Sequence, residues 1–123
     1  MLMSPFKGQT GLRRILNAAG YSFDGLRAAF VGEAAFRQLV LLNALLLPLA
    51  FWLDVSPVER ALMVAVSLLS LIVELLNSAV EAAIDRISLE RHPLSKNAKD
   101  MGSAAQLTSL AVITLVWAII LLG

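Results

Sequence analysis

Three long apolar segments constrain the fold of this 123-residue chain more than any other feature. They cover about residues 36–53, 58–84 and 103–122, and each reaches or approaches the roughly 20 residues that cross a bilayer core. Hydrophobic residues make up 59% of the chain, and a soluble domain of this size would have to expose much of that apolar surface. The sequence therefore predicts a single all-α membrane domain over residues 1–123, with three transmembrane helices.

The Lys and Arg residues are distributed unevenly around these segments. Five lie before or just inside the start of the first segment and four lie between the second and the third, whereas only Arg60 lies near the turn that joins the first to the second. Basic residues are retained on the cytoplasmic side of a membrane, so this bias places the N-terminus and the 85–102 loop in the cytoplasm. The net charge is only +1, whereas nucleic-acid-binding proteins usually carry a clear excess of basic residues, so no nucleic acid partner is expected.

An amphipathic helix is predicted over about residues 11–33, ahead of the first span. Its apolar residues recur at steps of three and four, which places them on one helix face. They are Leu12, Ile15, Leu16, Ala19, Phe23, Leu26 and Phe30. This pattern is typical of a helix that lies in the membrane interface with its apolar face toward the lipid. The alternative is a helix whose apolar stripe packs against the spans.

Acidic residues lie within the second span, where a charge is unfavourable. Glu74, Asn77, Glu81 and Asp85 follow one another at steps of three and four residues and therefore share one helix face. Buried carboxylates of this kind need basic partners, a metal ion or a proton. Glu74 and Glu81 are about 10 Å apart along a helix, which is too far for both to hold one small cation. Catalysis, a proton or cation pathway, and a structural contact between helices are the three interpretations that this stripe leaves open.

The 85–102 loop is rich in charge and contains the only histidine, His92. Lys99 and Asp100 stand directly before the third span, where they are also suited to be solvated anchors at a helix start. A single histidine gives no support for a metal site. The chain lacks the Gly-rich phosphate-binding loops and the catalytic signature of soluble kinases, so any nucleotide site must use another architecture.

Three blocks of sequence are distinctive. They are AAGYSFDGLRAAFVGEAAFRQ at 18–38, ELLNSAVEAAIDRI at 74–87 and KDMGSAA at 99–105. In this order they resemble the prokaryotic diacylglycerol kinases, which are small integral-membrane lipid kinases. The resemblance implies a homotrimer whose active sites lie between protomers at the cytoplasmic face of the bacterial inner membrane. It also implies transfer of the γ-phosphate of ATP, with Mg²⁺, to the hydroxyl of diacylglycerol, which yields phosphatidic acid and recycles diacylglycerol.

The resemblance also implies roles for the acidic residues. Glu74 matches the general base, and Asn77 matches a supporting residue in the catalytic stripe. Glu33 and Glu81 match the pair of carboxylates that holds the magnesium ion of the nucleotide, and carboxylate oxygens suit that metal. Leu39 stands where well-known relatives carry a glutamate, so no acidic role is carried over to that position.

Two further sets of residues follow from the resemblance. The nucleotide-binding set contains Tyr21, Glu33, Glu81, Glu90, His92, Lys99 and Asp100. The lipid-substrate set contains Arg14, Glu74 and Ser103. Since the acceptor is an alcohol on a lipid, it must approach from within the bilayer, and Glu74 lies deeper along the second span than Glu81. Phosphoryl transfer then needs mainly alignment and charge neutralisation from the protein.

Other functions remain open at this point. A kinase of the same fold that phosphorylates undecaprenol is the nearest alternative, although the blocks around Tyr21 and Glu33 resemble the diacylglycerol branch more closely. A small proton-coupled transporter would use Glu74 and Glu81 to carry protons or cations, and it predicts four spans or dual topology. A structural or regulatory membrane subunit would use the stripe only to bind a partner. Neither of the last two would turn over ATP.

Overall fold

Four helices make up the part of the chain that the structure describes. The computed structural model describes residues 10–123. Within that range α1 covers Gly11–Gly32, α2 covers Ala34–Trp52, α3 covers Pro57–Ile87 and α4 covers Pro93–Leu122, and there is no strand. α2, α3 and α4 are each long and apolar enough to cross a membrane. The prediction of an all-α protein with three candidate spans is therefore confirmed.

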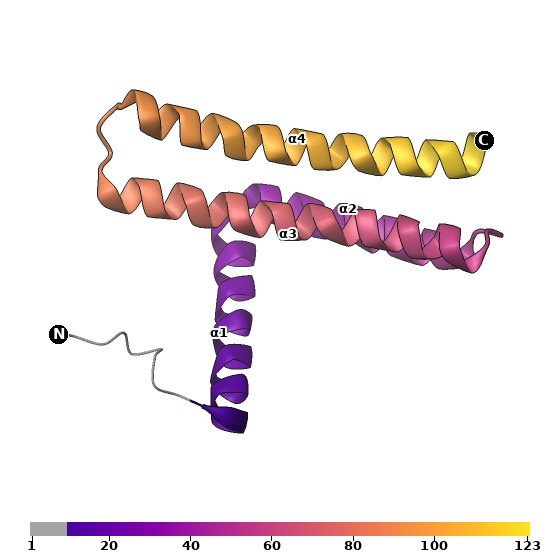
Figure 1. Cartoon of the computed structure of the whole chain (residues 1–123), viewed down its shortest axis with the longest axis horizontal. Coiled ribbons are helices and arrows are strands. Elements are labelled where there is room, and N and C mark those ends of the chain that lie inside the picture. Colours follow the sequence, from indigo (N-terminus) through magenta and orange to yellow (C-terminus); the bar gives the residue numbers. More distant parts are fainter. Residues whose placement is uncertain (1–9) are drawn as a thin grey trace.

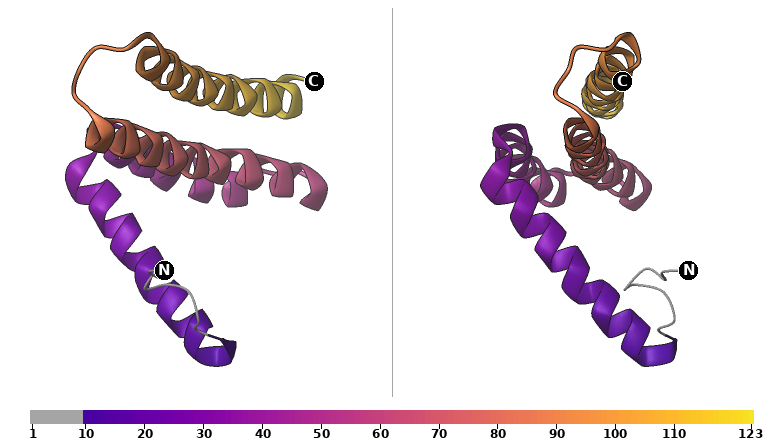
Figure 2. Two further views of the ribbon diagram at one scale, coloured as in Figure 1. Left: turned by 60° about the vertical axis from the view of Figure 1, so that its left-hand side comes forward. Right: turned by 90° about the vertical axis from the view of Figure 1, so that its left-hand side faces the viewer.

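α3 is the central helix of the bundle. It packs against α4 and against α2, while α2 and α4 make no direct backbone contact in the described chain. Figures 1 and 2 show these three helices running alongside one another. An apolar core of Ala50, Met63, Ile113 and Trp117 joins them toward the end that holds the α2–α3 turn. The apolar core therefore lies at one end of the bundle, away from the acidic stripe of α3.

The turn between α2 and α3 is held by its own polar residues. The Ser56 hydroxyl accepts a hydrogen bond from the Glu59 backbone N–H (3.2 Å), and the Glu59 carboxylate accepts one from the Ser56 N–H (2.9 Å). This reciprocal cap satisfies two N–H groups that the first turn of a helix leaves unpaired. Arg60 donates to the backbone carbonyls of Ala50 and Leu53, both at 3.0 Å. The single basic residue on this side of the bundle is thus used to close the hairpin.

A polar cluster at Ser70 ties the three spans together. Asn43 Nδ2 on α2 donates to Ser70 Oγ (3.2 Å), and Gln106 Nε2 on α4 donates to the Ser70 backbone carbonyl (3.0 Å). Ser70 Oγ in turn donates to the Ser67 carbonyl (2.6 Å). Asn43, Ser67 and Ser70 are all buried. Hydrogen bonds of this kind fix the relative positions of helices that lipid cannot drive together by the hydrophobic effect.

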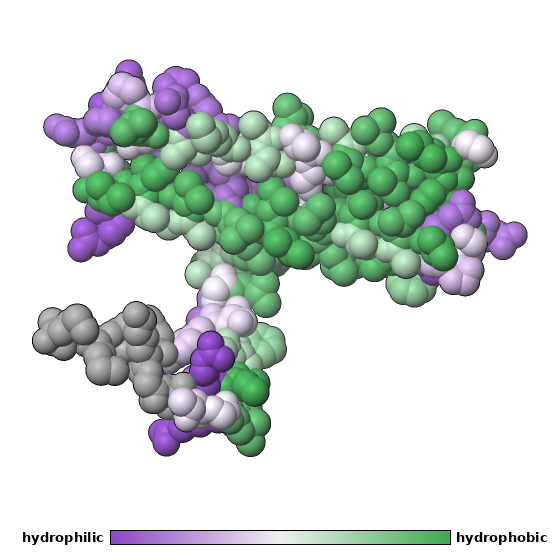
Figure 3. Space-filling model, in the orientation of Figure 1, coloured by the Kyte–Doolittle hydropathy of each residue, from purple (hydrophilic) through white to green (hydrophobic). Residues whose placement is uncertain are grey.

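α3 and α4 are longer than a membrane requires. They contain 31 and 30 residues, against 19 in α2. Since about 20 residues cross the hydrocarbon core, roughly 10 residues at the end of α3 and at the start of α4 extend beyond it. Figure 3 shows polar residues at this end and at the α2–α3 turn, with a hydrophobic band between them. By this count Glu81 and Lys99 lie beyond the hydrocarbon, and Glu74 lies close to its boundary.

The predicted 85–102 loop is mostly helical, which corrects its boundaries. α3 continues through Ile87 and α4 begins at Pro93, so residues 88–92 alone connect the two helices. Proline suits the first helical position because its missing N–H would be unpaired there, and His92 Nδ1 caps the helix by accepting from the Leu94 N–H (3.1 Å). Hydropathy locates the membrane-crossing part of a helix but not the polar turns that precede it. The predicted spans 36–53 and 58–84 differ from α2 and α3 by one to three residues at each end.

α1 leaves the bundle at a steep angle (Figures 1 and 2). Its only buried residue is Ala29, near its C-terminal end. The apolar stripe is exposed, with Leu12 and Phe23 accessible over 70% and 72% of their surface. The helix is present as predicted, and its stripe does not pack on the spans of its own chain.

Candidate active site

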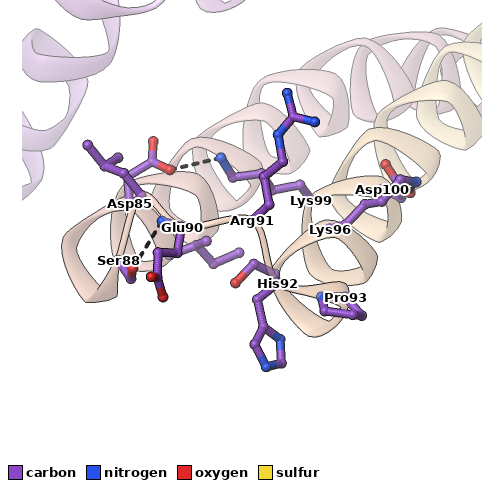
Figure 4. Close-up of a pocket in the computed structure, with 12 residues that line it drawn as sticks. Asp85, Ser88, Glu90, Arg91, His92, Pro93, Lys96, Lys99 and Asp100 are labelled. Atoms are coloured by element: carbon purple, nitrogen blue, oxygen red, sulfur yellow. Dashed lines mark hydrogen bonds and ion pairs between the residues drawn. The ribbon is translucent and has the colours of Figure 1, made fainter.

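A pocket of about 750 Å³ lies where α3 and α4 extend beyond the other helices. Its walls come from the end of α3, the connection at residues 88–92 and the first two turns of α4. Four residues predicted for the nucleotide-binding set line it, namely Glu90, His92, Lys99 and Asp100. Figure 4 shows their side chains around this end of the hairpin, with the His92 ring directed away from Lys99. The structure thus brings together four residues that the resemblance assigned to one ligand.

Two ion pairs order the basic side chains of this pocket. Lys99 Nζ lies 2.8 Å from Asp85 Oδ1 and links α4 to α3, and Lys96 Nζ lies 2.5 Å from Asp100 Oδ2 within α4. Lys99 also interacts electrostatically with Glu81, one turn before Asp85. The Lys99 and Asp85 side chains are 43% and 49% exposed, and such pairs contribute little stability. Lys99 therefore links the two helices while its ammonium group remains accessible to solvent.

A second cluster lies deeper along α3, around Glu74. Glu74 is only 5% exposed, and its Oε2 accepts a hydrogen bond from Asn77 Nδ2 at 3.4 Å. No Lys, Arg or His within residues 10–123 forms an ion pair with Glu74 or Glu81. The shared helix face predicted for Glu74 and Asn77 is confirmed by the contact between them.

Glu33 occupies the junction between α1 and α2. Its backbone N–H donates to the Ala29 carbonyl (2.9 Å) at the end of α1, and the residue is also the N-cap of α2. The Glu33 carboxylate accepts no capping hydrogen bond from the first turn of α2, so the carboxylate has no role in capping that helix. Arg37, one turn into α2, donates through Nη1 to the carbonyls of Phe30 and Val31 at 2.8 and 3.0 Å. The guanidinium thereby caps the C-terminal end of α1, where cations are favoured.

The carboxylates of Glu33 and Glu81 fit a magnesium ion in their chemistry. Both residues are partly buried, and neither carboxylate forms an ion pair with a basic side chain within residues 10–123. Magnesium is commonly bound by one or two carboxylates together with substrate phosphates, rather than by a full set of protein ligands. Consistently, no cluster of three or more acidic or histidine residues in residues 10–123 is arranged to hold a metal by itself.

Several predicted site residues are not brought together within one chain. Arg14 and Tyr21 lie exposed on α1, which Figure 1 shows leading away from the bundle. Ser103 is exposed on α4 and makes no side-chain hydrogen bond among those found. Neither Glu33 nor Glu81 lines the pocket formed by the ends of α3 and α4. One chain therefore presents parts of the predicted site on separate surfaces.

The structure also adds residues that were not predicted for the nucleotide site. Asp85, predicted only to share the acidic face of the second span, and Lys96, counted only among the basic residues, both line the pocket. Gly102 on α4 lies directly against the side chain of Asn77 on α3. Hydropathy places Gly102 just before the third apolar segment, so the sequence carries no signal for its position inside α4 or for its contact with Asn77.

Comparisons with known proteins agree on one family. Residues 20–121 match the family described as prokaryotic diacylglycerol kinase. A diacylglycerol kinase from Pseudomonas aeruginosa is 76% identical over 123 residues, which is 100% of both chains. One from Escherichia coli K12 is 52% identical over 112 residues, covering 91% of this chain and 92% of that protein. One from Helicobacter pylori 26695 is 46% identical over 107 residues, covering 87% of this chain and 84% of that protein. The chain belongs to the prokaryotic diacylglycerol kinase family.

Proposed function

We propose that this protein transfers the γ-phosphate of ATP to diacylglycerol at the cytoplasmic face of the bacterial inner membrane, which forms phosphatidic acid. The observation that carries the proposal is that Glu74 is buried and has no cationic partner in the described chain. This carboxylate is buried on the central span, lies near the boundary of the hydrocarbon and has an amide rather than a cation as its neighbour. A membrane protein keeps such a group mainly where it has chemistry to perform.

The nucleotide binds at the α3–α4 pocket. Lys99 and Lys96 supply positive charge for the phosphates, and Glu90, His92 and Asp100 surround the remaining part of the nucleotide. Tyr21 on α1 completes the nucleotide-binding set. Because this end of the hairpin extends beyond the hydrocarbon, a water-soluble nucleotide can reach it without entering the membrane.

Glu33 and Glu81 would hold the magnesium ion that accompanies ATP. When bound, the ion would offset the negative charge of the phosphates that are transferred and released. Glu81 lies between the pocket and Glu74 along α3, so its carboxylate is suited to hold the ion between the nucleotide site and the general base.

Glu74 acts as the general base toward the lipid. The hydroxyl oxygen of diacylglycerol attacks the γ-phosphorus, the bond to the β–γ bridging oxygen breaks, ADP leaves, and Glu74 takes the hydroxyl proton. Asn77 supports Glu74 through its amide. Arg14 and Ser103 lie on the side of the lipid substrate. A positioned base of this kind contributes about 100- to 10,000-fold in rate.

The functional unit is a homotrimer in which neighbouring chains share each site. The support is that α1 makes no backbone contact with α4 and leads away from the bundle (Figure 1), and that neither Arg14 nor Tyr21 lines the pocket. A neighbouring copy can supply the missing side chains. The exposed apolar stripe of α1 then lies in the membrane interface, with the N-terminus and the segment at 85–102 in the cytoplasm.

Undecaprenol kinase activity is the alternative within the same fold. The test is a competition assay with purified protein, ATP and Mg²⁺, in mixed micelles that contain diacylglycerol, undecaprenol or both. We expect phosphatidic acid to form faster than the polyprenyl phosphate. A strong preference for the polyprenol would overturn the choice of substrate. Absence of lipid-dependent ATP turnover would favour a transporter or a structural subunit.

A further inference from the structure

Gly102 is the only glycine inside α1 or α4 whose hydrogen faces a side chain of another helix at close range. A methyl carbon built at Gly102 would overlap Asn77 Oδ1 and lie 3.1 Å from Asn77 Cγ. The same carbon at Gly20, Gly25 or Gly32 would meet no atom within 4 Å. The space that any other residue would need at position 102 is therefore already filled by the Asn77 amide.

The contact fixes which way the Asn77 amide points. Its Oδ1 is buried against Gly102 and has no hydrogen-bond partner in the described chain. Its Nδ2 is directed at Glu74 Oε2, 3.4 Å away. Gly102 therefore contacts Asn77, and Asn77 contacts Glu74, so the contacts lead from the α4 backbone to the buried carboxylate. Asparagine has a short side chain, so its amide cannot give way to a methyl group at position 102 without turning about Cα–Cβ or Cβ–Cγ.

We propose that Gly102 is a positioning residue for the proton transfer from the lipid hydroxyl to Glu74. Because Gly102 has no side chain, the Asn77 amide has enough space to face Glu74. This inference rests on the proposed function, in which Glu74 takes the proton of the lipid hydroxyl. Gly102 itself touches neither substrate nor nucleotide in this account. Its effect passes through Asn77, so a larger residue at position 102 displaces the amide and the carboxylate loses its neighbour.

The test compares Gly102→Ala with the wild type and with Gly25→Ala as a matched control. Gly25→Ala makes the same change at a helical position with open space, so its rate should equal that of the wild type. For Gly102→Ala we expect kcat for diacylglycerol phosphorylation to fall about 10- to 100-fold, since a misplaced active-site group has effects of this size. The KM for ATP should stay within about twofold of the wild type, because the pocket residues are unchanged.

A double-mutant cycle separates positioning from simple packing. Asn77→Ala removes the side chain that a methyl at position 102 would strike. The double variant Asn77→Ala/Gly102→Ala should therefore have the same kcat as Asn77→Ala alone, and its Tm should recover toward that of Asn77→Ala. If Asn77→Ala proves inactive, the recovery of Tm in the double variant alone decides whether the contact between Gly102 and Asn77 exists. The Gly102→Ala variant then decides whether that contact affects kcat.

Three results would overturn the inference. Equal kcat for wild type and Gly102→Ala would show that the contact has no bearing on catalysis. Equal losses of Tm from Gly102→Ala in both backgrounds would mean that Gly102 only separates the helix backbones. A raised KM for ATP with unchanged kcat would place its effect on the nucleotide instead. Absence of phosphatidic acid from the wild type would overturn the proposed function itself, and this inference with it.

Discussion

Lys99 on α4 pairs with Asp85 on α3 at 2.8 Å, across the hairpin that lines the pocket. The two residues are 14 positions apart in the chain. They meet because α3 continues as a helix through residue 87 and α4 begins again at residue 93. The pair is half exposed, so it holds Lys99 in the pocket and leaves it available to a phosphate.

Replacing Lys99 with methionine should weaken ATP binding while leaving the fold intact. A charged hydrogen bond to phosphate is lost, so the KM for ATP should rise about tenfold or more. Stability should change little, because the pair with Asp85 is half exposed. Initial rates over a range of ATP concentrations measure the first effect, and thermal unfolding in detergent measures the second. Lys99→Arg, which keeps the charge, is the control. An unchanged KM in Lys99→Met would argue against phosphate contact.

Replacing Glu81 with alanine should change the metal dependence of the reaction. The Mg²⁺ concentration that gives half-maximal rate should increase, or turnover should cease, because one of two protein ligands is lost. Chelation of Mg²⁺ should abolish activity in the wild type. A Mg²⁺ titration of both proteins at saturating ATP makes the comparison. The same half-maximal Mg²⁺ concentration in both would contradict the assignment of Glu81.

Replacing Arg37 with alanine should loosen the junction that carries Glu33. The variant loses two hydrogen bonds to the carbonyls of Phe30 and Val31, so stability should fall by about 1 kcal/mol. If Glu33 depends on this junction, the Mg²⁺ requirement should rise as well. Arg27→Ala on α1, where no hydrogen bond from the side chain is found, is the control. A Mg²⁺ titration and thermal unfolding of both variants check the prediction, and identical results for the two would contradict it.

The polar cluster at Ser70 should affect stability rather than catalysis. Asn43→Ala removes the hydrogen bond between α2 and α3, which should cost about 1 kcal/mol in a membrane. The kcat should stay close to that of the wild type because Ser70 lies one turn deeper than Glu74. Unfolding in detergent and the kinase assay give the two readings. A large loss of kcat with unchanged stability would mean that the cluster takes part in the reaction.

The spans and the acidic stripe could be predicted from the sequence because both depend on local periodicity. Glu74 and Asn77 share a helix face through their spacing alone, and the structure places them in contact. The contact between Gly102 and Asn77 could not be predicted, since it depends on how α4 is aligned along α3. The start of α4 at Pro93 was signalled by the proline and by His92, but hydropathy favoured a later start. The relation of Glu33 to Glu81 could not be predicted either, because Glu33 lies at the junction of α1 and α2, Glu81 lies on α3, and sequence spacing does not say how these elements pack.

The most direct test of the account is the rate of phosphatidic acid formation by Glu74→Gln. Glutamine keeps the size and polarity of the side chain but cannot accept the hydroxyl proton. At saturating ATP and diacylglycerol, the rate should fall by about 100-fold or more, while thermal unfolding and oligomer size stay those of the wild type. Asp54→Asn, the same change at an exposed residue of the α2–α3 turn, should leave the rate unaltered. A Glu74→Gln protein that kept most of the wild-type rate would contradict the central claim that this buried carboxylate is the base.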